Sequence, residues 1–130
     1  MKQNYSNMEK RKSERVEVSF TVTYRVNKPP TIFMLVGGKE VCALMMDLSE
    51  GGMALLTEYE MPAGTELSIK FTLINFEADK EHYVWLMEIV GKVIYCGPGE
   101  KGESRLGINF TQIEKKDRAA IADFVKTIKA

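Results

Sequence analysis

Hydrophobic and polar residues alternate along several short stretches of this 130-residue chain. In residues 17–26, valine, phenylalanine and tyrosine occupy every second position, and the positions between them are polar. Residues 67–73 and 105–110 show the same alternation. A period of two residues is typical of an antiparallel strand with one buried face. The pattern therefore predicts three strands that each contribute one face to a core.

The other apolar stretches are shorter or less regular. Residues 40–46 and 53–57 flank a polar hexapeptide, and residues 32–36 lie between a Pro-Pro pair and a Gly-Gly pair. Each of these stretches predicts a short strand. Residues 83–95 are largely apolar around an internal glycine, Gly91, which predicts a long strand bent at a bulge.

The end of the chain changes to a helical period. Thr111 and Glu114 have the spacing of a capping box, which marks a helix start. The apolar residues that follow recur at positions i, i+3, i+4 and i+7: Ile121, Phe124, Val125 and Ile128. One amphipathic helix is therefore predicted, and its apolar face must cover a hydrophobic surface. Together, the elements predict an all-β fold: a small six-stranded antiparallel barrel with a C-terminal α-helix.

The length of the chain is sufficient for one domain. We expect a flexible tail over residues 1–9 and a single domain over 10–130. Within that domain, an arginine-bearing arm spans 10–16, the barrel spans 17–110 and the terminal helix spans 111–129.

Charge and hydropathy limit the classes of function. Eighteen basic and eighteen acidic residues cancel, so no overall field would attract nucleic acid or an anionic membrane. No apolar run approaches the roughly 20 residues of a membrane helix, and the first residues lack the apolar core of a secretion signal. We expect a cytoplasmic protein that meets any anionic ligand with a local cluster of charge.

Catalytic and metal chemistry have little support. The only histidine, His82, lies beside Glu81 in a polar connector, where Glu77 and Asp79 alternate with it. Neither a nucleophile–base pair, a phosphate loop nor metal-ligand spacing occurs. We expect no enzymatic activity, no metal and no cofactor.

The two cysteines show no pairing signal. Cys42 and Cys96 lie in apolar runs without CxxC spacing or a neighbouring histidine. Both are expected to be small buried thiols.

Two polar stretches carry candidate binding chemistry. The hexapeptide 47–52 contains Asp47, Ser49 and the glycine pair Gly51 and Gly52. Asp and Ser side chains close turns on their own backbone, and glycines permit positive φ and the close approach of a ligand. Upstream, Arg11 and Arg15 are four residues apart and project on the same side of the chain.

These residues resemble the motifs of the PilZ domain, a bacterial receptor module for cyclic diguanylate (c-di-GMP). Arg11 and Arg15 match Arg-x-x-x-Arg, and Asp47, Ser49 and Gly52 match Asp-x-Ser-x-x-Gly. Residues 105–110 before the terminal helix are similar to the family's last strand. The resemblance covers nearly the whole chain from 10 to 128.

The resemblance implies a barrel whose arginine arm wraps over c-di-GMP. Arg11 and Arg15 would bind phosphate and the guanine edge, because guanidinium matches both groups. Asp47 would accept from guanine N1–H and N2–H. Ser49 would add a hydrogen bond and fix the turn, and Gly52 would leave space for the base.

Three further positions extend or depart from this pattern. Lys10, Gly51 and Arg105 are additional candidates for ligand contact, and a basic Lys10 before the first arginine is compatible with two ligands per chain. Many family members carry proline at the position of Glu14. The glutamate makes the arm more flexible than proline would, and it puts an acid near the anion.

The leading interpretation is a non-catalytic c-di-GMP effector. Binding would order the arm and relay the signal to a downstream protein partner that the sequence does not identify. The alternatives are a PilZ-fold interaction adaptor that no longer binds nucleotide and a small nucleic-acid-binding barrel. Net charge near zero disfavours the nucleic-acid barrel, so we expect neither nucleic-acid binding nor membrane insertion.

Overall fold

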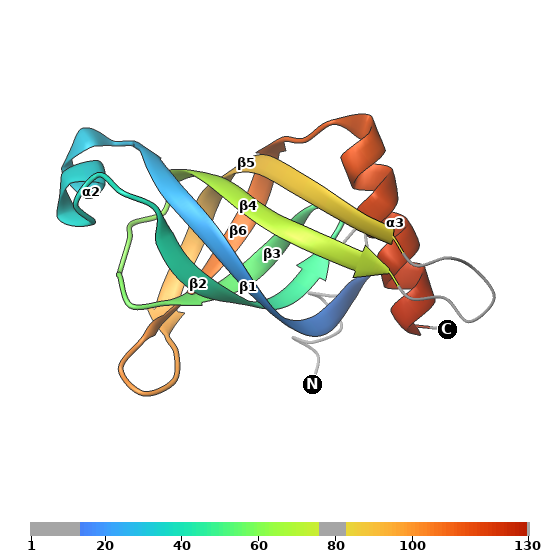
Figure 1. The fold of residues 1–130 in the computed structure, drawn as a ribbon. Helices are drawn as coiled ribbons and strands as arrows, with labels where there is room; N and C mark the ends of the chain where they lie inside the picture. The colour runs from blue at the N-terminus through green and yellow to red at the C-terminus, as the bar shows by residue number, and fades with distance from the viewer. Residues whose placement is uncertain (1–13, 76–82, 130) are drawn as a thin grey trace.

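The structure is a computed structural model that describes residues 14–75 and 83–129 (Figure 1). Its strands are β1 (Arg15–Lys28), β2 (Val41–Ser49), β3 (Gly52–Thr57), β4 (Glu66–Asn75), β5 (Tyr83–Pro98) and β6 (Ser104–Gln112). The described helices are α2 (Pro30–Leu35) and α3 (Lys115–Lys129).

The six strands form a closed barrel in the order β1-β2-β3-β6-β5-β4, and every neighbouring pair is antiparallel. Strand β3 is buried at all six positions, and the alternating strands direct every second side chain into one core. On β4, for example, Leu67, Ile69 and Leu73 are at most 1% exposed. The predicted fold class, a six-stranded antiparallel barrel with a C-terminal helix, is confirmed.

Strand β5 is bent where the sequence predicted a bulge. Its register with β6 shifts between Val90 and Gly91. A Cβ added at Gly91 would lie 2.7 Å from the Ile108 side chain and 3.0 Å from the Asn109 carbonyl oxygen. Glycine therefore permits β6 to cross β5 closely at the bend.

The segment predicted as a strand at 32–36 is instead part of helix α2. Pro30 opens this helix, where a fixed φ suits the first turn, and the amides of Ile32 and Phe33 both donate to the Pro29 carbonyl at 3.1 Å. None of the six α2 residues is buried. The strand prediction was wrong because five apolar residues do not distinguish a strand from one exposed helical turn.

Helix α3 lies at the opposite end of the barrel from α2 (Figure 1). Ile121, Phe124 and Val125 are buried as predicted, and the Phe124 ring lies 5.8 Å from that of Phe20 on β1. Ile128 is 52% exposed, so its predicted place on the buried face was wrong.

The predicted start of α3 at residue 111 was also wrong, because β6 continues to Gln112. The Thr111 hydroxyl donates to the Val90 carbonyl of β5 at 3.3 Å and caps no helix. Instead, the Glu114 carbonyl accepts the first amides of the helix, from Asp117 and Arg118.

The prediction of two buried thiols was wrong for Cys42, which is exposed, while Cys96 is half-buried against the core. The neighbours of Cys42 on β2, Val41 and Ala43, point into the barrel. Strand alternation therefore places Cys42 on the outer face.

Candidate functional site

Asp47 and Ser49 lie on the last residues of strand β2, so the link to β3 consists only of Glu50 and Gly51. Leu48 between them is fully buried, and Asp47 consequently projects from the outer face of the barrel. In the sheet, Asp47 lies opposite Glu17 of β1 and Ala54 of β3. A rigid strand pair, rather than a loose turn, positions the carboxylate.

The carboxylate of Asp47 is held between two guanidinium groups. Arg15, the first residue of β1, donates from Nη1 to Asp47 Oδ1. Arg105 on β6 donates from Nη2 to Asp47 Oδ2 at 3.1 Å. The side chains of Arg15, Asp47 and Arg105 are 27%, 13% and 36% exposed. We call these three residues the arginine–aspartate cluster.

A tyrosine that the sequence analysis did not identify extends the cluster. The Arg105 Nε donates to the Tyr95 hydroxyl at 3.3 Å. Tyr95 lies opposite Gly107 on β6, and a Cβ at Gly107 would fall 2.4 Å from the tyrosine ring. The ring therefore packs over bare backbone. The available signal was Gly107 itself, at an outward-facing position of an alternating strand.

Ser49 fixes the link between β2 and β3. Its hydroxyl accepts from the Gly51 amide and donates to the Gly52 carbonyl, both at 3.3 Å, and the residue is 3% exposed. This geometry agrees with the expected turn-fixing role. The hydroxyl is engaged with backbone on both sides, so any contact with a ligand would be additional.

The backbone of the two glycines differs from the expected one, and Gly52 is in close contact with a neighbouring strand. Neither Gly51 nor Gly52 has a positive φ, so the positive-φ interpretation was wrong. A Cβ at Gly52 would instead lie 2.1 Å from the Ile108 carbonyl oxygen of β6. The Gly51 carbonyl also accepts from the Phe110 amide at 2.9 Å. Close packing of β3 against β6 therefore demands glycine at position 52.

Several predicted residues lie outside the described residues. These are Lys10 and Arg11 of the arm and, in the 75–81 connector, Glu77, Asp79 and Glu81 with the neighbouring His82. The convergence of Arg11 with Arg15 stays a prediction, as does a second ligand beside Lys10. Glu14, the departure from the family pattern, is exposed.

The cluster is suited to a ligand that combines anionic and hydrogen-bonding groups. Two guanidinium groups and one carboxylate carry a net positive charge. Arginine matches phosphate oxygens and the O6 and N7 acceptors of guanine, while a carboxylate accepts from guanine N1–H and N2–H. Each carboxylate oxygen of Asp47 accepts from one arginine and keeps a second lone pair with which it could accept from a guanine.

Two contacts connect the start of helix α3 to the rest of the barrel. Arg118 Nη1 donates to the Glu50 carbonyl at 3.1 Å, inside the link that follows Ser49. Its neighbour Asp117 is 7% exposed and accepts from the Trp85 indole N–H of β5 at 2.8 Å. The Arg118 side chain of the helix therefore contacts the backbone of the β2–β3 link at the candidate site.

Metal binding finds no support in residues 14–75 and 83–129, where no group of three His, Cys, Asp or Glu side chains could hold an ion. Among the same residues, no helix has the length and apolarity needed to cross a membrane.

Comparison with protein families gives one match. The model of the PilZ domain matches residues 9–127, which is nearly the whole chain. Among curated proteins, none matches this chain significantly.

Solved structures with the same fold are distant in sequence. The inhibitor of motility of Bacillus subtilis (MotI/DgrA) has a TM-score of 0.72 at 15% identity, and the match covers 92% of this chain and 51% of that chain. The PilZ domain of YcgR from Escherichia coli, solved with c-di-GMP, has a TM-score of 0.60 at 14% identity, with 92% of each chain covered.

The PlzA protein of Borreliella burgdorferi, solved in complex with c-di-GMP, has a TM-score of 0.57 at 18% identity; the match covers 94% of this chain and 43% of that chain. The chain spans about half the length of MotI/DgrA. At these identities the likeness shows the fold, and the bound c-di-GMP belongs to the relatives.

Proposed function

The chain belongs to the PilZ domain family, whose members are non-catalytic receptors, and we propose that it binds c-di-GMP at the arginine–aspartate cluster. The observation that carries the proposal is the position of Asp47 between Arg15 and Arg105, on the outer face of strands that a closed barrel holds rigid. Preorganised groups bind more tightly because less side-chain freedom is lost on binding.

We assign complementary roles to the three residues. Arg15 and Arg105 turn outward to phosphate or to guanine O6 and N7, and the released Asp47 carboxylate accepts from guanine N1–H and N2–H. Without ligand, Asp47 neutralises one of the two cations and keeps both guanidinium groups near their working positions. Ser49 and Gly52 act by maintaining the shape of the β2–β3 link.

Tyr95 provides a flat surface at the edge of the same face. Tyr95 is 47% exposed as a residue, its ring packs over Gly107, and its hydroxyl accepts from Arg105. We propose that Tyr95 holds Arg105 in place while the arginine is bound to Asp47.

The signal would leave the site by two routes. The expected arm over residues 10–16 is shorter in the structure, because Arg15 and Val16 already belong to β1. Binding would draw residues 10–14 onto the ligand, with Arg11 joining Arg15, and create a surface for a protein partner. Movement of the β2–β3 link would also reach α3 through the bond between Arg118 and the Glu50 carbonyl. Trp85, bonded to Asp117 of this helix, would then change its environment.

Calorimetric titration with c-di-GMP tests the proposal, with GMP and cyclic diadenylate as controls. We expect saturable binding of c-di-GMP and at least tenfold weaker binding of the adenine analogue, because adenine lacks the N1–H donor that Asp47 recognises. The molar ratio at saturation gives the number of ligands per chain, one or two. Absence of c-di-GMP binding by folded protein would contradict the proposal.

An interaction adaptor without nucleotide is the second candidate. The apolar side chains of Phe33, Met34 and Leu35 on α2 are 37%, 74% and 59% exposed, and exposed apolar groups of this size favour protein contacts. The cluster would then be a structural ion pair, satisfied without any ligand. Unchanged stability on adding c-di-GMP, together with absent binding, would favour this candidate.

A further inference from the structure

Helix α2 is an anchored apolar projection at one end of the barrel (Figure 1). Val36, directly after the helix, is 1% exposed, and Ile32 packs against the core. The Gly38 amide donates to the Phe33 carbonyl at 2.9 Å and closes the last turn. The helix therefore holds in solvent the apolar side chains that we call the α2 tip: Phe33, Met34 and Leu35.

The segment that carries the α2 tip is basic. Residues 27–39 contain Lys28 and Lys39 and no acid. The Lys28 side chain is 64% exposed although its ammonium lies 3.8 Å from Glu66, and Lys39 is exposed. Glu40, which follows, is already engaged in an ion pair at 3.4 Å. The α2 tip therefore combines apolar side chains with two exposed positive charges.

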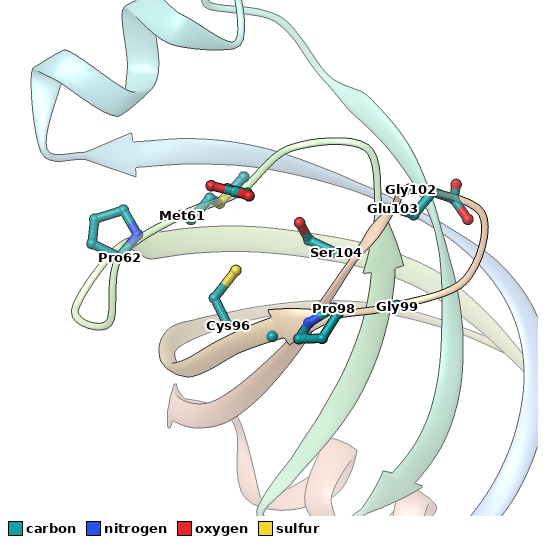
Figure 2. A pocket seen from close by; sticks show the side chains of 10 residues that line it. Met61, Pro62, Cys96, Pro98, Gly99, Gly102, Glu103 and Ser104 are labelled. Atoms are coloured by element: carbon teal, nitrogen blue, oxygen red, sulfur yellow. The ribbon is translucent and has the colours of Figure 1, made fainter.

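A hollow of the opposite charge lies between the β3–β4 connection and the β5–β6 hairpin (Figure 2). Its volume is about 690 Å³, and its described lining includes Glu60 and Glu103 but no Lys, Arg or His. Figure 2 shows Pro62 on the connection and Pro98 at the end of β5, where they give the hollow apolar walls. We call it the acidic hollow.

The α2 tip and the acidic hollow are neighbours on the molecule. Figure 1 shows α2, the β3–β4 connection and the β5–β6 hairpin at the end of the barrel opposite α3. Pro29 and Pro30 at the start of the helix share a smaller hollow with Pro62, which also lines the acidic hollow. No residue of α2 lines the acidic hollow, so the tip does not fill the hollow of its own chain.

From this complementarity we propose that two copies of the chain associate through this end of the barrel, and that each places its α2 tip in the acidic hollow of the other. A two-fold axis near Pro62 relates the two contacts. Lys39 of one copy faces Glu60 of the second copy, and the tip packs on Pro62 and Pro98. An isologous contact of this kind closes at two copies.

Charge selects a second copy over a membrane as the occupant. The connection and the hairpin carry four acids and one base: Glu58, Glu60, Glu100, Glu103 and Lys101. An anionic membrane would attract the two lysines beside the α2 tip but would repel these acids at the same end of the barrel. A second copy presents acid where the tip is basic, and apolar walls where the tip is apolar.

Sedimentation velocity of the parent protein tests the proposal over concentrations from micromolar to millimolar, without c-di-GMP. A reducing agent prevents disulfides through the exposed Cys42. We expect a reversible monomer–dimer equilibrium that salt weakens, because salt screens complementary charges. A mass of one chain at every concentration would overturn the proposal and leave the α2 tip to a different protein. A mass that grows beyond two chains would overturn the two-fold arrangement.

Charge reversal tests the pairing of Lys39 with Glu60. Lys39→Glu and Glu60→Lys should each weaken dimerisation by about tenfold, because every dimer contains the reversed pair twice. An equimolar mixture of the two variants should dimerise as the parent does, since both contacts of a mixed dimer again join opposite charges. This restoration would also show that both variants are folded. A mixture that dimerises as weakly as the separate variants would overturn the pairing.

Lys126→Glu is the matched control for these variants, because Lys126 is an exposed lysine of α3 at the other end of the barrel. It makes the same change of charge and should leave dimerisation unchanged. An effect as large as that of Lys39→Glu would show that net charge, rather than the α2 tip, governs association.

A second pair of variants tests the apolar contact. Met34→Ser should weaken dimerisation by about tenfold or more, because the Met34 side chain is buried twice in each dimer. Leu86→Ser is the control, since Leu86 on β5 is 75% exposed and Met34 is 74% exposed. Dimerisation of Met34→Ser as strong as that of Leu86→Ser would exclude the α2 tip from the interface. The proposal does not depend on the arginine–aspartate cluster, whose residues Arg15, Asp47 and Arg105 do not line the hollow.

Discussion

Replacing Arg15 by alanine tests the proposed c-di-GMP site most directly. Arg15 lies at the first position of β1, and its guanidinium contacts a carboxylate that is only 13% exposed. The substitution removes one of the two cations around Asp47 and leaves Arg105 bonded to the other oxygen. The barrel core is unaffected because the side chain lies on the outer face.

The expected effect on binding follows from the contact that Arg15 would make with a phosphate or a guanine edge of the ligand. Removing one member of a desolvated, hydrogen-bonded charge pair costs about 2 to 4 kcal/mol, which corresponds to a loss of affinity of roughly 30- to 900-fold. The ion pair is partly exposed, so the free energy of unfolding should fall by no more than about 1 kcal/mol. Arg15→Lys should lose less affinity, since lysine keeps the charge without the fork of donors.

Calorimetry gives the affinity, and denaturant unfolding of the same preparations gives the stability. Arg25→Ala is the matched control, because Arg25 is an exposed arginine on the same strand, outside the cluster. It removes the same charge, so any general electrostatic effect should appear in both variants. If Arg15→Ala binds c-di-GMP as tightly as Arg25→Ala, the assignment of Arg15 to the site is wrong.

Three further predictions concern glycine contacts and one buried phenol. Gly52→Ala should lower the free energy of unfolding by about 1 to 3 kcal/mol in denaturant titrations, since the new methyl group would meet the Ile108 carbonyl at 2.1 Å; unchanged stability would refute the close approach. Gly107→Ala should displace the Tyr95 ring and weaken c-di-GMP binding several-fold in calorimetry, and equal affinity would show that the ring's position is irrelevant. Burial raises the pKa of Tyr24 from 10.0 to about 12, so its contribution to stability is complete below pH 10 and is lost as the pH rises to 12. Between pH 10 and pH 12, the free energy of unfolding of the parent protein should fall more steeply with pH than that of Tyr24→Phe, by up to about 1.4 kcal/mol per pH unit. Parallel pH profiles of the two proteins would contradict this expectation.

The structure departs from the sequence pattern in three places, each for a local reason. Residues 32–36 were assigned to a strand although Pro30 was placed to start a helix, and Thr111 was read as a cap although it continues β6. The apolar pattern at 32–36 is too short to distinguish a strand from a helix, and the capping-box spacing of Thr111 and Glu114 occurs here at the end of a strand. Cys42 was expected in the core because its run is apolar, and only alternation along β2 places it outside.

Part of the candidate site could be predicted from the sequence. Arg15 and Asp47 could be paired in advance because a known motif places them together, and the structure brings them into contact. Arg105 was a minor candidate and Tyr95 was missed. Tyr95 reaches the cluster only through Arg105, and its place over Gly107 depends on the register of β5 with β6.

The amino-acid sequence alone determined the six strands of the barrel, the presence of a terminal helix and the family, because periodicity and motif residues are local properties of the chain. Tertiary structure decided which distant side chains meet. Arg105 and Asp47 are 58 positions apart and become neighbours only when β3 lies between β2 and β6 in the closed barrel. It also decided why residue 52 must be glycine, because the obstacle to a side chain there is the backbone of another strand.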